Sequence, residues 1–163
     1  MKRFLFWTAA VVLLLLVSGS KAQAQDIYNT ILSDARATAD NTEANIVVRK
    51  IATFKRDDLC YIRQKAVEVL EEVSYKFLDD QAYYLNLFIQ SFIQDVLLNE
   101  NLTQSEKKKK IQLYIDATGS NPLFYDSDRE LVNAYVNDSK NQYTPFCLDT
   151  NWIKAFEAVK SQE

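Results

Sequence analysis

The sequence has 163 residues, with 19 basic and 22 acidic side chains, no histidine, two glycines and two prolines. The lack of histidine excludes Ser-His-Asp and Cys-His catalytic groups and every histidine metal site, and two glycines are too few for a glycine-rich phosphate loop. So few glycines and prolines also argue against a β architecture that depends on many turns.

The first 24 residues have the pattern of a secretory signal peptide. Lys2 and Arg3 precede an uncharged apolar run over 4–17, and Ala22-Gln23-Ala24 then forms an A-x-A cleavage pattern. The apolar run is too short to span a bilayer comfortably, which takes about 20 residues. We therefore predict cleavage after Ala24 and export to a periplasmic or extracellular location, with an uncleaved membrane anchor as the alternative.

Residues 25–163 then form a single domain with 16 basic and 22 acidic side chains. Its formal charge, 16 − 22 = −6, disfavours binding to phosphate backbones, so we predict no nucleic-acid partner. We also expect no transmembrane segment in the mature chain, because no later run resembles one.

Helical periodicity begins at Asp26 and continues to Ala39. The stretch 40–43 interrupts it with a capping-box pattern, in which Asp40 accepts hydrogen bonds from backbone amides and Glu43 reaches back. A second apolar face follows from Ile46 onwards. We expect two helices here, although a solvated face within one longer helix fits the same residues.

The stretch 55–58, Lys-Arg-Asp-Asp, places basic residues where a helix would end and acidic residues where one would start, as the macrodipole favours. This pattern predicts a helix boundary, followed by an apolar face from Leu59 to Phe77. Asp79-Asp80 is expected to cap the next helix. Residues 58–99 would thus form two antiparallel helices or, because neither glycine nor proline interrupts them, one long helix.

The stretch 79–101 is the expected centre of the fold. Its apolar side chains recur at helical spacing, and no charge falls between Asp80 and Asp95. A helix that is apolar around most of its girth is covered by several neighbours. The polar residues left over are Asn86, Gln90, Ser91 and Gln94. The three amides among them form a stripe and are candidate binding residues unless they simply face water.

A capping box at Thr103 and Glu106 predicts the start of the next helix. Gly119 is expected to end that helix, because glycine readily adopts the left-handed backbone of a helix C-terminus. A further capping box at Ser127 and Glu130 predicts a short helix.

Residues 140–148 contain a proline and are expected to be irregular or extended. Asp149 or Thr150 is then expected to cap a last helix whose apolar face begins at Trp152. The sequence as a whole predicts an all-α fold, a compact bundle of about five to seven helices around the central apolar helix 79–101.

Cys60 and Cys147 are the two cysteines, and both lie in the part predicted to be exported. In an oxidising compartment an even number of cysteines indicates disulfides, so we predict one bond between them. Two buried thiols or an intermolecular bond are the alternatives. A reactive thiol at Cys60, activated by the amides of a first helical turn, is a further interpretation that the lack of a C-x-x-C motif argues against.

Two groups of side chains are candidate binding surfaces. The only run of like charges could contact anionic lipid headgroups or a polyanion, although a solvated helix face is the preferred interpretation; it consists of Lys107, Lys108, Lys109 and Lys110. Tyrosines could line a groove for a sugar or a peptide, with core packing as the preferred alternative; they are Tyr83, Tyr84, Tyr114, Tyr125, Tyr135 and Tyr143.

Acidic pairs such as Asp57-Asp58 point in different directions on a helix, so we do not expect them to act as a catalytic pair. We expect neither cofactor nor metal. The sequence thus predicts a non-enzymatic, exported helical module that binds a protein or envelope component. A protein that holds a small apolar ligand between its helices is the alternative, and a carboxylate-dependent enzyme is a third possibility.

Overall fold

The computed structural model describes residues 26–124 and 144–162 of the chain. These residues form helices and no strand, so the all-α prediction is confirmed for them. The elements are α2 (Ile27–Asp40), α3 (Ile46–Val69), α4 (Tyr75–Phe92), the π-helical turn η1 (Ile93–Leu97), α5 (Gln104–Gly119) and α7 (Trp152–Lys160). Several predictions lie outside the described residues: the signal peptide over 1–24, the groove tyrosines Tyr125, Tyr135 and Tyr143, and the capping box at Ser127 and Glu130.

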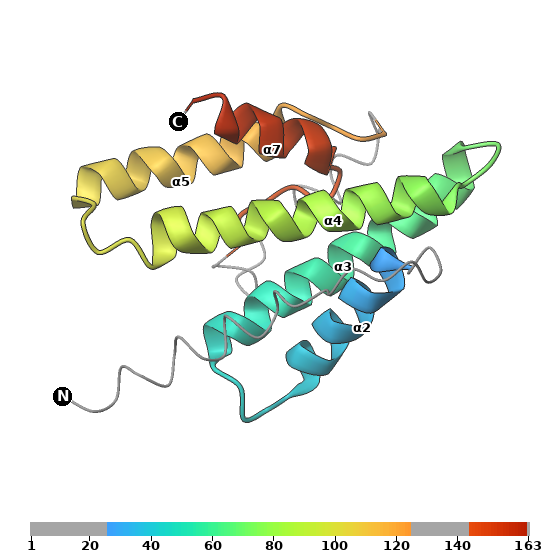
Figure 1. Cartoon of the computed structure of the whole chain (residues 1–163), viewed down its shortest axis with the longest axis horizontal. Coiled ribbons are helices and arrows are strands. Elements are labelled where there is room, and N and C mark those ends of the chain that lie inside the picture. Colours follow the sequence, from blue (N-terminus) through green and yellow to red (C-terminus); the bar gives the residue numbers. More distant parts are fainter. Residues whose placement is uncertain (1–25, 125–143, 163) are drawn as a thin grey trace, which may run out of the picture.

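Helix α4 lies in the middle of the bundle (Figure 1). Helices α2 and α3 pack together on one side of it, and α5 and α7 pack together on the other side. Helix α4 and η1 cover most of the stretch 79–101, whose apolar girth predicted a central position. None of the described helices is both long and apolar enough to cross a membrane.

The core consists largely of aromatic side chains from distant parts of the chain. Phe88 of α4 meets Tyr114, Phe146 and Trp152 edge to face, with ring centroids 5.1, 5.3 and 5.2 Å away. Phe54 of α3 contacts Phe146 at 5.8 Å and Trp152 at 6.0 Å in the same way. Such pairs add to the stabilisation that burial provides. Tyr114 is therefore a core residue and lines no groove.

Residues 144–151 form an irregular segment that passes through the core, behind α4 in Figure 1. The Phe146 side chain is fully buried between the aromatic residues of α3 and α4. A buried segment without a sheet partner needs other acceptors for its backbone amides. The Cys147 amide donates to Thr118 Oγ1 at 3.4 Å, and the Asn151 amide donates to the Asn121 carbonyl at 2.7 Å.

The predicted helix boundary at 55–58 is wrong, because these residues lie inside α3. Residues 58–99 do form two helices, but the second starts at Tyr75, where Ser74 Oγ accepts from the Phe77 amide at 3.1 Å. Asp79 does not cap its own helix. Its Oδ1 accepts from the Tyr28 amide at 2.8 Å, so this carboxylate satisfies an amide in the first turn of α2.

The other terminal signals were partly correct. The break after Asp40 and the capping box at Thr103 and Glu106 are confirmed, although Asn45 and not Asp40 caps α3. Gly119 is the last residue of α5 and lacks a left-handed backbone. The cap of α7 is Asn151, which follows the two predicted candidates directly.

The predicted disulfide is wrong, because Cys60 and Cys147 are not bonded to each other. Phe54 and Asp58 mark the face of α3 that meets the segment 144–152. At 3.6 residues per turn, Cys60 lies about 200° around the helix from Asp58, on the exposed side. Phe146, next to half-buried Cys147, packs on Phe54, so the segment that carries Cys147 lies on the face of α3 that Cys60 does not share.

Candidate functional site

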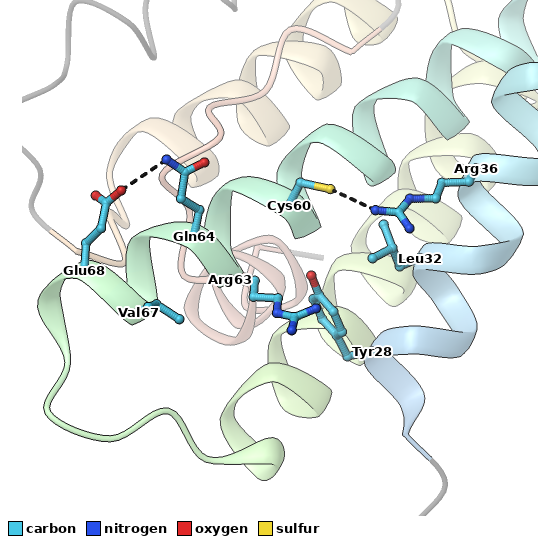
Figure 2. A pocket seen from close by; sticks show the side chains of 8 residues that line it. All are labelled: Tyr28, Leu32, Arg36, Cys60, Arg63, Gln64, Val67 and Glu68. Atoms are coloured by element: carbon cyan, nitrogen blue, oxygen red, sulfur yellow. Dashed lines mark hydrogen bonds between the residues drawn. The ribbon is translucent and has the colours of Figure 1, made fainter.

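A hollow between α2 and α3 contains a free thiol and two guanidinium groups (Figure 2). It has a volume of about 410 Å³ and is widely open to solvent. We call this hollow the thiol groove; its lining residues are Tyr28, Leu32, Arg36, Cys60, Arg63, Gln64, Val67 and Glu68.

Helical spacing explains why these side chains share one surface. The α2 residues follow each other at intervals of four, and the α3 residues lie at i, i+3, i+4, i+7 and i+8 from Cys60. Residues at such intervals lie on one face of a helix. The two faces meet where α2 packs against α3. Tyr28 and Leu32 are buried at the floor, whereas the arginines are exposed.

Tyr28 is fixed at the floor of the thiol groove. Its hydroxyl donates to the Leu59 carbonyl at 2.9 Å. Burial raises the pKa of Tyr28 to about 12, and the adjacent Cys60 thiol adds to this rise, while Arg63 and Arg36 oppose it. The phenol therefore stays protonated at neutral pH and acts as a donor.

The charge in the thiol groove is mainly positive and lacks a carboxylate partner. Arg36 Nη2 donates to Cys60 Sγ at 3.7 Å, and the Arg63 guanidinium lies beside Tyr28 (Figure 2). Among the described residues, no carboxylate lies within 4.0 Å of either guanidinium. Glu68 also lines the groove, but it accepts from Gln64 at 3.1 Å and pairs with a lysine at 3.4 Å.

The turn between α3 and α4 exposes apolar side chains next to the groove. We call this end of the bundle the tip patch; it consists of Val69, Leu70 and Tyr75, which are 51%, 38% and 80% exposed. Val67 is 66% exposed but lies about 200° around α3 from Val69, on the face of the thiol groove. Two exposed acids, Glu71 and Glu72, lie in the same turn. The turn forms one end of the bundle in Figure 1, so the patch is open to a partner.

The amides predicted as binding residues do not converge on a site. Asn86 Oδ1 accepts from Lys55 Nζ at 2.6 Å, Gln90 is half-buried and Gln94 is exposed. Neither of the two hollows identified among the described residues includes any of them. Tyr83 is 47% exposed and rests edge to face on a neighbouring tyrosine at 5.5 Å.

Lys55 lies between Asn86 of α4 and Asp34 of α2, a position that the sequence did not reveal. Burial lowers the pKa of Lys55 to about 8, although the Asp34 carboxylate works against this change. The lysine looked like a helix-ending residue in the sequence, and only the continuity of α3 places it between helices.

The lysine run occupies the first turns of α5. Lys108 and Lys109 are exposed, whereas Lys107 and Lys110 are half-buried. Hydrogen bonds from Thr103 lower the pKa of the Glu106 carboxyl just before the run. A contact with anionic headgroups or a polyanion stays a prediction for these lysines.

A buried polar cluster holds the start of α7. Trp152 Nε1 donates to Asp58 Oδ2 at 2.8 Å, and the Trp152 amide donates to Gln81 Oε1 at 2.9 Å. Asp58 Oδ1 and Thr144 Oγ1 are buried without a partner among the described residues. Burial raises the pKa of Asp58 well above its usual value; the bond from Trp152 opposes the rise, and Asp149 adds to it. The sequence contained one sign that Asp58 is buried: it lies on an apolar helix face, four residues after Phe54 and four residues before Ile62.

Comparisons of the chain with protein-family models, with curated proteins and with solved structures gave no match. Function is therefore inferred from the residues of this chain alone. Among the described residues, no group of three cysteine or acidic side chains could hold a metal ion.

Proposed function

We propose that the protein is an exported, non-enzymatic helical module that binds a protein partner through the tip patch. The observation that carries the proposal is the exposure of the apolar tip patch at an open end of the bundle. Protein interfaces are enriched in tyrosine and other large apolar side chains, and exposed apolar clusters commonly mark such interfaces.

The charges around the tip patch favour a protein over a membrane surface. Glu71 and Glu72 lie between Leu70 and Tyr75, so the turn itself carries negative charge. Anionic headgroups attract basic segments and repel acidic ones. A partner surface with an apolar centre and basic rim would match the tip patch.

The positions of the acidic pairs support a binding role over catalysis. Asp57 pairs with a neighbouring arginine, and Asp58 is buried against Trp152. Asp79 accepts from the first turn of α2, and the carboxylate after it pairs with a lysine. Each of these four acids thus has a separate structural contact. Asp26 and Asp34 do line one hollow, but Asp26 there accepts from the Asn29 amide as the cap of α2, so it already has a structural role.

The crosslinking experiment uses a photoreactive residue at Tyr75 and, as the matched control, one at exposed Gln112 of α5. Exported full-length protein is irradiated in envelope extract, and the crosslinked species are identified by mass spectrometry. We expect a discrete protein adduct from position 75 and none from position 112. Leu70→Glu should reduce the adduct at least tenfold, because a charge in an apolar interface centre is costly. A monomer that captures no partner at position 75 would contradict the proposal.

Export is tested separately by N-terminal sequencing of the protein recovered outside the cytoplasm. Cleavage after Ala24 predicts a mature chain that begins at Gln25. An intact Met1 in the membrane fraction would favour the uncleaved anchor.

A further inference from the structure

We propose that the thiol groove is a covalent site for small anionic thiols, which Cys60 takes up as a mixed disulfide. The ligand class is a low-molecular-weight thiol that carries carboxylates and arrives as its disulfide. The site goes beyond the proposed protein binding, because it uses the α2–α3 surface and a different chemistry.

Cys60 is accessible from solvent within the thiol groove. Its thiol is exposed and not in a disulfide, and it lies in an open hollow of about 410 Å³ on the α2–α3 surface. Leu32 and Tyr28 provide an apolar floor beneath it. The thiol is thus accessible to a disulfide, and the hollow provides room for the attached group.

The two arginines of the groove have weaker hydrogen-bond partners than other arginines on α3. Elsewhere on α3, Arg49 donates to a backbone carbonyl at 3.3 Å and Arg56 binds a carboxylate at 2.8 Å. In the groove, Arg36 donates to a thiol at 3.7 Å, and Arg63 lies beside the phenol of Tyr28, which itself donates to the Leu59 carbonyl. A thiol and a phenol are weak partners for guanidinium groups, which form their strongest bonds with carboxylates.

Both guanidinium groups line the same groove as the Cys60 thiol. Arg36 reaches Cys60 from α2, and Arg63 lies one turn along α3 on the same groove face. A carboxylate held by either guanidinium therefore places the rest of its molecule over the sulfur atom. The two cations select anionic disulfides over neutral or cationic ones before any bond is exchanged.

The chemical step is a thiol–disulfide exchange. Cys60 Sγ, as the thiolate, attacks one sulfur of a disulfide RSSR, the Cys60–SR bond forms and the original S–S bond breaks. The departing RS⁻ takes up the proton that Cys60 released. The Cys60 sulfur is oxidised and the departing sulfur is reduced, so no other oxidant is needed.

The test measures the rate of adduct formation by intact-mass spectrometry in a Cys147→Ser background, so that Cys60 is the only thiol. The probes are glutathione disulfide (anionic), 2-hydroxyethyl disulfide (neutral) and cystamine (cationic). Each rate is divided by the rate of the same probe on the urea-unfolded protein, which removes differences in intrinsic reactivity. We expect the ratio for glutathione disulfide to exceed that for cystamine by about tenfold at low salt.

The double variant Arg36→Gln/Arg63→Gln should reduce this preference to near unity. Both arginines are exposed, so the variant should retain the fold, which circular dichroism checks. The matched control is Lys108→Gln/Lys109→Gln, which removes two exposed positive charges outside the groove and should leave the preference unchanged. Equal ratios for the three probes, or an equal loss in the lysine control, would overturn the proposal.

Discussion

Asp58→Asn is expected to stabilise the protein at and above neutral pH. The Asp58 side chain is 0% exposed; Oδ2 accepts from Trp152 Nε1, and Oδ1 has no partner among the described residues. An ionised carboxylate with a single hydrogen bond is costly in such a site. Burial therefore raises the pKa of Asp58 well above its usual value, and the neutral acid is the favoured folded form.

The sign of the pH effect follows from this rise. Below about pH 4 the carboxyl is protonated in both the folded and the unfolded chain, and its contribution to stability is fully present. As the pH rises from there to the folded-state pKa, only the unfolded chain releases the proton. The free energy of unfolding then falls by about 1.4 kcal/mol for each pH unit. Asparagine keeps an oxygen that accepts from Trp152, and because it does not ionise, the fall in the free energy of unfolding with pH disappears. If its amide hydrogens stay unpaired, the variant loses roughly 1–3 kcal/mol of this gain.

Urea unfolding of the wild type, Asp58→Asn and Asp58→Ala, repeated at several pH values between about 5 and 8, measures the effect. The advantage of Asp58→Asn should grow with pH, because other titrating groups cancel in the difference between the two proteins. Asp58→Ala leaves the Trp152 indole N–H unpaired and should be about 1–3 kcal/mol less stable than Asp58→Asn at every pH. An Asp58→Asn advantage that stays constant or shrinks with rising pH would refute the reasoning.

Lys55→Met should stabilise the protein by roughly 1–2 kcal/mol at pH 7. This range is smaller than the free energy of the pKa shift alone, because the Lys55 side chain is partly exposed. Because the pKa of Lys55 is lowered to about 8, the wild type should become more stable as the pH rises from there toward the usual lysine value of about 10.4. Urea unfolding should show that this increase is absent in Lys55→Met. Phe146→Ala empties a fully buried site and should cost about 3–5 kcal/mol, read as a lower thermal midpoint. Thr103→Ala removes the cap of α5 and should cost about 0.5–2 kcal/mol in thermal unfolding, while Ser105→Ala in the same turn stays within about 0.5 kcal/mol of the wild type.

The helices were predictable because their apolar residues recur at helical intervals. The periodic stretch 79–101 predicted a central element, and α4 with η1 covers most of it. The capping box at Thr103 and Glu106 was also recognisable, because both hydrogen bonds join residues three positions apart. Such signals are local, so one sequence contains all the information that they require.

Helix boundaries failed where a charged side chain has a distant partner. Lys55 contacts α4, and Asp58 contacts Trp152 at the start of α7, so the stretch 55–58 continues a helix although its charges resemble a boundary. Asp79 resembles a cap for its own helix, but it serves Tyr28 of α2. A rule based on neighbouring residues cannot distinguish these cases, because the partner lies between 31 and 94 positions away in the sequence.

The thiol groove was not predictable from spacing within any single stretch. Its residues come from two helices, and their meeting depends on the rotation and register with which α2 packs on α3. Cys60 attracted attention in the sequence for a different reason, its expected place in a first helical turn. The structure places it in the middle of α3, away from the free amides of a helix start, where Arg36 donates to its sulfur.

The rotation of α3 accounts for both the missing disulfide and the accessible thiol. Trp152 fixes one face of α3, because its indole bonds to Asp58 and its ring packs on Phe54. The segment that carries Cys147 leads directly into Trp152 and is therefore held on that same face. Cys60 is turned about 200° away, toward α2 and the arginines. Any change that rotated α3 enough to bring the two sulfur atoms together would remove Asp58 from Trp152, so the core that stabilises α7 also keeps Cys60 free.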